Sequence, residues 1–113
     1  FTIYSGNDDQ IVPILSLGGS GVISVLANVL PKETHDIVEK YLAGDVVESR
    51  KLQLGVNELV SSLFIEVNPI PVKAAMNLMG MEAGELRLPL TNISEQNLEI
   101  LRNNMIKYGI KVD

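Results

Sequence analysis

Among the ionisable residues of this sequence, Lys73 is the first candidate for chemistry, because a lysine amine can form an imine with a carbonyl compound. Lys73 follows Pro69 and Pro71 in a predicted short helix and does not stand at the end of a strand. A lysine in such a place is expected to be solvated or bound to a backbone carbonyl. We therefore expect no imine at Lys73.

The one histidine and its acidic neighbours are the next candidates. His35 stands early in a predicted helix, and Glu33, Asp36 and Glu39 follow the spacing of a solvated helix face, which argues against an acid–base pair. One histidine and no cysteine exclude a multi-histidine metal centre, a thiolate metal site and disulfides. The sequence predicts neither a metal nor a cofactor.

Two short motifs have simple structural explanations. The glycine-rich run 18–21 suggests a phosphate cradle, but it precedes its strand, whereas phosphate-binding loops follow a strand and open a helix. We expect a tight helix-to-strand turn there. Asn92-Ile93-Ser94 is a formal glycosylation acceptor, and we expect a turn and a helix N-cap.

The elements that carry these residues begin with two strand–helix pairs. Residues 1–5 and 21–25 are apolar and β-branched, as in strands. A helix with Asp8 or Asp9 as its N-cap is predicted after the first strand, and a helix from Pro31 to Ala43 after the second. Nearly continuous apolar strands separated by a helix indicate a parallel sheet that is covered on both faces.

Three helices are predicted in the remainder of the chain. Asp45 caps a long helix that ends near Phe64, and a short helix runs from about Pro71 to Met79. After an extended connector at 85–90, Ser94 caps the last helix.

Length and composition limit the function classes. The 113 residues carry a net charge of −5, which argues against binding of nucleic acids or anionic membranes, and no apolar run is long enough to span a membrane. We expect a cytoplasmic protein. Two parallel strands leave unprotected edges, and Phe1 begins within a predicted strand, so we expect the later part of a larger α/β fold.

Four strings occur in an order that resembles a known family: 5–8, 18–25 together with 27–29, 68–73 and 87–90. Together they resemble the C-terminal part of the dihydrodipicolinate (4-hydroxy-tetrahydrodipicolinate) synthase family, within the pyruvate-dependent class I aldolases. The first two strings are shared across that superfamily, which includes N-acetylneuraminate lyase. The string Asn-Pro-Ile-Pro-Val-Lys at 68–73 favours the synthase branch.

The resemblance implies the C-terminal part of a (β/α)8 TIM barrel, a fold that needs about 250 residues when complete. Residues 1–44 would form the last two βα units of the barrel, and residues 45–113 a C-terminal extension of three helices. In the family this extension helps to build a homotetramer.

The resemblance also implies a lyase of lysine and diaminopimelate biosynthesis. The parent enzyme would condense pyruvate with aspartate-semialdehyde through a Schiff base. The family's imine-forming lysine and proton-relay tyrosine would lie upstream of Phe1, so this chain would hold no catalytic residue and be inactive alone.

Three residues of this chain would line the substrate site. The resemblance implies that the backbone carbonyl of Ile23 lies beside pyruvate, and that Gly6 and Asp8 belong to a loop that contributes to the pocket of the second substrate. It leaves open whether Asp8 or Asp9 faces that substrate. From residue type alone, Ile23 reads as a core residue, and Gly6 and Asp8 read as turn and cap residues.

Two alternatives stay open. One is a related aldolase that acts on sialic acid or a sugar acid. The other is a non-catalytic helical assembly module. The unpaired strand edges of a barrel fragment predict that the isolated chain associates with itself.

Overall fold

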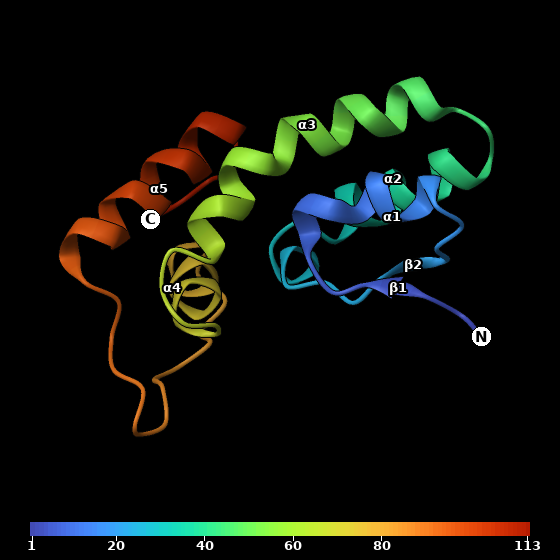
Figure 1. Ribbon diagram of the computed structural model, residues 1–113. Coiled ribbons are helices and arrows are strands. Elements are labelled where there is room, and N and C mark those ends of the chain that lie inside the picture. Colours follow the sequence, from blue (N-terminus) through green and yellow to red (C-terminus); the bar gives the residue numbers. More distant parts are fainter. The chain divides into compact units, whose positions relative to one another are not determined.

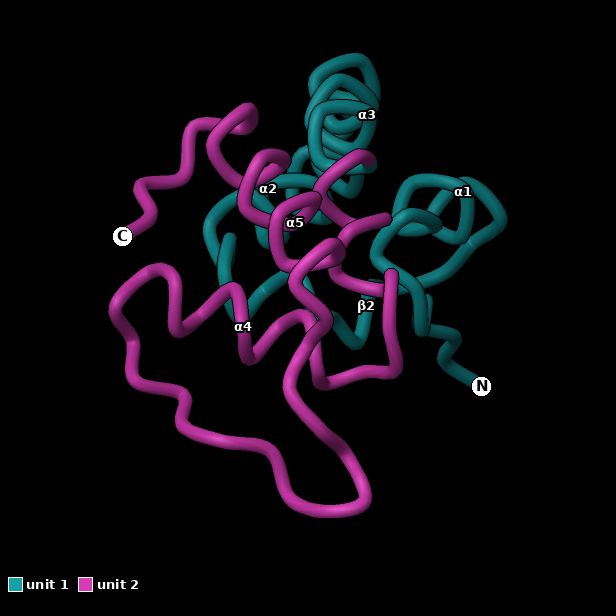
Figure 2. The backbone as a smooth tube through the Cα atoms, turned by 90° about the vertical axis from the view of Figure 1, so that its left-hand side faces the viewer, with its two compact units in different colours: residues 1–57 teal, residues 58–113 magenta.

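A computed structural model describes all residues from Phe1 to Asp113, which form two compact units. Unit 1 is Phe1–Asn57 and unit 2 is Glu58–Asp113 (Figure 2). The division into 1–44 and 45–113 refers to the parent fold and stays a prediction. None of the helices combines the length and apolar character that a membrane span requires.

Unit 1 contains a two-stranded parallel sheet, β1 (Tyr4–Ser5) and β2 (Gly21–Val22) (Figure 1). In this sheet Tyr4 lies opposite Gly21. A helix follows each strand, α1 (Ile11–Ser16) and α2 (Pro31–Leu42). The predicted parallel pairing and the two βα units are therefore confirmed.

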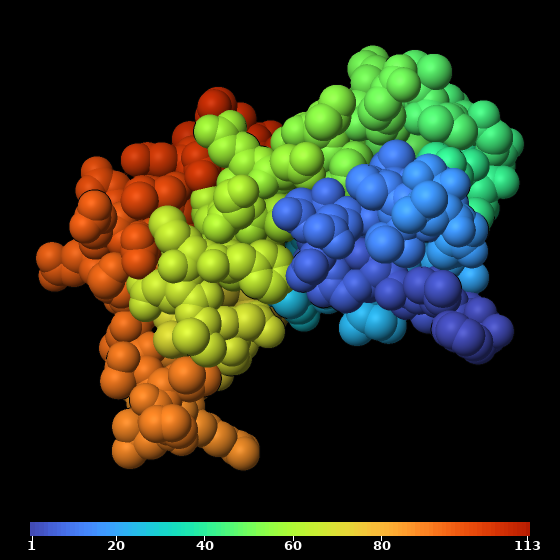
Figure 3. All heavy atoms as spheres, viewed as in Figure 1, coloured from blue at the N-terminus to red at the C-terminus, as the bar shows by residue number.

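The strands are shorter and more exposed than the sequence predicted. The expected strands 1–5 and 21–25 retain two residues each in the sheet, and Phe1, Ile3 and Tyr4 are all at least half exposed. The first residues of the chain, dark blue in Figure 3, project from unit 1. The sheet has two strands. Because Ile3 and Tyr4 are exposed, the predicted cover of the sheet on both faces is wrong for this chain.

The turn between α1 and β2 depends on its glycines. Gly18 adopts a φ of +95°, and the Gly19 N–H donates to the Ile14 carbonyl at 2.9 Å. The run 18–21 is therefore the predicted helix-to-strand turn.

The core of unit 1 consists of buried apolar side chains, among them Ile11, Leu15, Leu26, Val29, Ile37 and Val56.

Helix α3 (Val46–Leu63) begins where predicted, since the Asp45 carboxylate accepts a hydrogen bond from the Glu48 N–H at 3.2 Å. In unit 2, α4 (Ile70–Leu78) packs against α5 (Glu95–Tyr108). The three predicted helices are thus confirmed to within about a residue at each end. The core of unit 2 includes Leu59, Val60, Leu63, Val72, Ala75, Leu101 and Met105.

Candidate functional site

The ends of β1 and β2 form the candidate site, because the carboxyl ends of parallel strands meet at one edge of a sheet. The segment 6–8 follows β1, and Ile23 follows β2. The Ile23 N–H donates to the Ser5 carbonyl at 2.9 Å, which continues the ladder beyond β2. The chain thus brings the predicted residues Gly6, Asp8 and Ile23 to the same edge.

The carboxylate of Asp8 is buried and fully engaged. Asp8 is 1% exposed; its Oδ2 accepts the N–H groups of Val25 and Leu26, each at 3.0 Å, and its Oδ1 accepts the Ser24 hydroxyl. The prediction that Asp8 or Asp9 caps the helix that follows it is therefore wrong, since neither makes a side-chain cap there. Asp8 instead caps the 3-10 turn at Leu26–Asn28, whose first N–H groups need an acceptor.

Gln53 of α3 is a buried partner that the sequence analysis missed. Its Nε2 donates to the Asp8 carbonyl at 2.8 Å, and its Oε1 accepts the Val12 N–H at 3.0 Å. Ser49, Gln53 and Val56 share one face of α3 and are all buried. Polar residues on the same helix face as apolar ones were the available signal for such a contact.

Ile23 is exposed at the candidate site and is not packed in the core. The residue is 72% exposed, so the interpretation as a core residue is wrong. No donor of the chain reaches its carbonyl oxygen, which can therefore accept a hydrogen bond from a ligand. Around Gly6 a Cβ would meet no atom within 4 Å, so there is open space beside it. This edge can bind and orient a ligand, but it offers no nucleophile.

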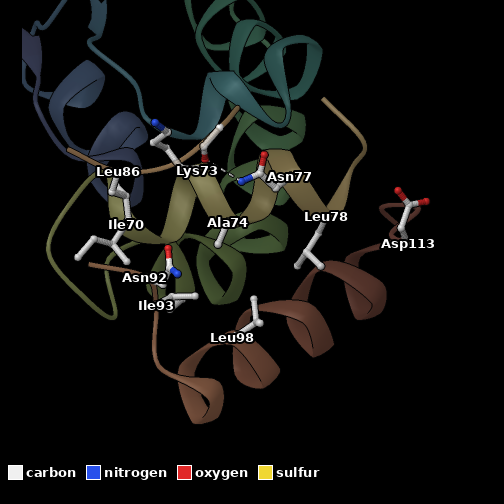
Figure 4. A pocket seen from close by; sticks show the side chains of 11 residues that line it. Ile70, Lys73, Ala74, Asn77, Leu78, Leu86, Asn92, Ile93, Leu98 and Asp113 are labelled. Carbon is white, nitrogen blue, oxygen red and sulfur yellow. Dashed lines mark hydrogen bonds between the residues drawn. The ribbon is translucent and has the colours of Figure 1, made fainter. Parts of the chain in front are cut away.

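A pocket of about 390 Å³ lies within unit 2, between α4, the connector and α5 (Figure 4). The Nζ of Lys73 donates to the Glu85 carbonyl at 2.5 Å, and the Nδ2 of Asn77 donates to the Gly84 carbonyl at 3.2 Å. The predicted carbonyl-capping role of Lys73 is confirmed. Apolar side chains supply much of the remaining wall, from Ile70, Ala74, Leu78, Leu86, Ile93 and Leu98.

The other ionisable candidates lie outside both sites. His35 is exposed, as predicted. Asp36 pairs with Lys32 at 2.7 Å, and this hydrogen bond lowers the pKa of Asp36 and raises the pKa of Lys32. Asp36 is therefore paired with a lysine and not with another acid.

Glu66 stabilises the start of α5. Its Oε2 accepts the Asn97 Nδ2 at 2.9 Å and the Ser94 N–H at 3.0 Å, and these bonds lower the pKa of Glu66. Ser94 is the N-cap, since its Oγ accepts the Asn97 N–H at 3.2 Å. The predicted cap in the triplet 92–94 is confirmed.

The chain thus has two parallel βα units, accessible carboxyl ends of the strands, and three further helices. A known family matches this chain. The chain matches the dihydrodipicolinate synthetase family over residues 1–107 and belongs to it. The resemblance noted from the sequence is therefore confirmed.

Individual relatives are synthases of that family. The 4-hydroxy-tetrahydrodipicolinate synthase of Acetivibrio thermocellus is 62% identical over 110 residues, which are 97% of this chain and 38% of that protein. The structure of dihydrodipicolinate synthase from Thermotoga maritima matches with a TM-score of 0.94 at 46% identity, over 97% of this chain and 37% of that one. A chloride-inhibited synthase from Acinetobacter baumannii, complexed with pyruvate, matches with a TM-score of 0.92 at 39% identity, over 97% and 38%.

These neighbours are TIM-barrel enzymes, and the relatives are lyases of lysine biosynthesis. The chain spans less than two fifths of the length of the relatives that it matches. It is thus a small α/β segment of the family's fold.

Proposed function

We propose that this chain is the C-terminal part of a 4-hydroxy-tetrahydrodipicolinate synthase. Residues 1–44 supply the last two βα units of a (β/α)8 barrel, and residues 45–113 supply its helical extension. The observation that carries this proposal is the match of 97% of the chain to 38% of a synthase. The exposed edge and apolar side chains of the two-stranded sheet support it, because such a surface needs neighbouring strands.

The complete enzyme condenses pyruvate with aspartate-semialdehyde through an imine on a lysine outside this chain. Within this chain, the Ile23 carbonyl accepts a hydrogen bond from the imine or from its carbinolamine precursor. The exposure of the Ile23 residue and the lack of a donor to its carbonyl within the chain support this role. The pyruvate complex of the Acinetobacter baumannii neighbour supports the choice of substrate.

Gly6 lines the pocket of the second substrate, where the open space beside it allows close approach. Asp8 belongs to the same loop, with its carboxylate turned into the protein. The enzyme works as a cytoplasmic homo-oligomer, and helices α3, α4 and α5 contribute to its assembly. It uses no cofactor.

The chain alone is inactive in this proposal. The strand ends carry no amine, and the Nζ of Lys73 is bound to a backbone carbonyl in unit 2. Borohydride reduction in the presence of labelled pyruvate should therefore leave the isolated chain unlabelled. Stable labelling of Lys73 would contradict the proposal.

Reconstitution tests the active complex. This chain is co-expressed with the matching upstream part of the Acetivibrio thermocellus synthase, and the purified complex is assayed with pyruvate and aspartate-semialdehyde. Turnover by the complex, with borohydride labelling on the upstream part alone, is the expected result. Cleavage of N-acetylneuraminate without turnover of aspartate-semialdehyde would instead support the related aldolase.

A further inference from the structure

We infer that Asp8 is a positioning residue, which fixes the direction of the Ile23 carbonyl through the turn after β2, and that its carboxylate does not contact the second substrate. The effect of Asp8 on catalysis rests on the proposed function. In the same loop, Gly6 lines the pocket of the second substrate, whereas Asp8 positions the Ile23 carbonyl.

The carboxylate of Asp8 is buried and held in place by its hydrogen bonds. Its carboxylate accepts three hydrogen bonds, from the Ser24 hydroxyl and from the N–H groups of Val25 and Leu26. A buried carboxylate is costly unless it is hydrogen-bonded, so these donors hold it firmly. To face a ligand, the carboxylate would have to leave all three donors.

The direction of the Ile23 carbonyl is set by the peptide group between Ile23 and Ser24, to which its oxygen belongs. On one side of this peptide, the Ile23 N–H is bound to the Ser5 carbonyl at 2.9 Å. On the other side, the Ser24 hydroxyl donates to Asp8 and accepts the Ala27 N–H at 2.9 Å. The peptide is therefore held from both ends, and Asp8 holds one of them.

Asp8 itself is anchored to α3 through the side chain of Gln53. Gln53 binds the Asp8 carbonyl at 2.8 Å and the Val12 N–H at 3.0 Å. Gln53 is 4% exposed, so water competes little for these bonds. The carbonyl of Ile23 is thus tied, through Ser24 and Asp8, to the buried face of α3.

The isolated chain tests the structural half of the inference. In Asp8→Asn, one side of the side chain becomes an N–H₂ donor that faces other donors, so amide hydrogen exchange at Val25 and Leu26 should accelerate by roughly tenfold or more. Asp9→Asn is the matched control, because Asp9 is exposed and its exchange pattern should stay as in the parent chain. Unchanged exchange at Val25 and Leu26 in Asp8→Asn overturns the inference.

The reconstituted complex tests the catalytic half. In Asp8→Asn, the rate of imine formation with pyruvate, measured by borohydride trapping, should fall roughly ten- to a hundredfold, as expected for a misplaced group. The KM for aspartate-semialdehyde should stay unchanged. Ser24→Ala keeps the charge of Asp8 and should lower the same rate by less, which covers the case in which Asp8→Asn does not fold. Glu39→Gln, on an exposed position of α2, is the charge control.

The outcomes separate the two proposals. A raised KM for aspartate-semialdehyde with unchanged imine formation would place Asp8 in the second-substrate pocket and overturn the inference. An unsubstituted complex without turnover would count against the proposed function, and the exchange experiment alone would then decide whether Asp8 orders the turn.

Discussion

Gly19 shows how one residue type determines whether α1 can turn back into β2. A Cβ at this position would lie 2.5 Å from the Ile14 Cγ2 and 2.8 Å from the Ile14 oxygen, and the oxygen belongs to the helix backbone. We predict that Gly19→Ala lowers the free energy of unfolding by about 1–3 kcal/mol, because the turn must open. Urea unfolding followed by circular dichroism measures the change.

Gly55 provides the matched control for Gly19. It lies exposed within α3, and a Cβ there would meet no atom within 4 Å. Gly55→Ala should raise the free energy of unfolding by about 0.5–1 kcal/mol, since alanine favours a helix. Equal effects of the two substitutions would contradict the role given to the Gly19 turn.

At the scale of elements, the start of α5 should respond to pH. The hydrogen bonds from Asn97 and Ser94 lower the pKa of Glu66 in the folded chain below its ordinary value of 4.5. The stabilisation is therefore fully present above that ordinary pKa and is lost as the pH falls through the lowered pKa of the folded state. An NMR titration should show the Ser94 amide signal moving in this acidic range, together with faster exchange.

The variant Glu66→Gln should abolish this pH response at Ser94. Glu99→Gln removes an acid from an exposed position of α5 and should leave the response intact. A Ser94 amide that titrates equally in both variants would argue against the bond from Ser94 to Glu66.

The packing of α5 in unit 2 yields a second prediction about an element. Leu101 is fully buried, whereas Ile106 on the same helix is 51% exposed. Leu101→Ala should lower the free energy of unfolding by about 2–5 kcal/mol through the cavity it leaves. Ile106→Ala should change it by about 0.5 kcal/mol or less. Thermal unfolding of both variants checks the pair, and equal losses would mean that α5 does not bury the face described.

Local signals explain why some elements were predictable from sequence. Pro31, Asp45 and Ser94 start helices through groups within a turn of their own position, and the structure confirms all three starts. In this chain β1 pairs only with β2 and is two residues long, and an apolar run in the sequence does not say where pairing stops. The donors of Asp8 lie more than a dozen residues away, beyond the reach of a local capping rule.

For the candidate site, the approximate place of the residues was predictable from sequence, whereas their burial and contacts were not. The approximate place of Gly6, Asp8 and Ile23 at one sheet edge follows from two parallel strands. The burial of Asp8 and its contact with Gln53 do not follow from the two strands. They depend on the packing of α3 onto a turn that is far away in sequence. Residue type gave the wrong exposure for Ile23, because the exposure of an apolar side chain depends on which parts of the fold cover it.

At the scale of the whole molecule, the isolated chain should associate. Phe1, Ile3 and Tyr4 are exposed beside the unpaired edge of the two-stranded sheet. Light scattering should show a mass that rises with concentration, and Ile3→Lys should reduce the rise, because a charge on the edge opposes strand pairing.

Leu88→Lys is the control for this effect. Leu88 is 87% exposed in the connector of unit 2, away from any strand, so the substitution should leave association unchanged. A chain that remains monomeric at all concentrations, with well-protected amides in β1 and β2, would instead favour an autonomous helical module.

The buried carboxylate of Asp8, after β1, also favours the native register of the sheet over shifted ones. A slip of one residue between β1 and β2 would carry Ser24, Val25 and Leu26 away from Asp8 and leave a negative charge enclosed without donors. Mispaired forms of this short ladder are therefore penalised by electrostatics even though few backbone bonds distinguish them from the native pairing.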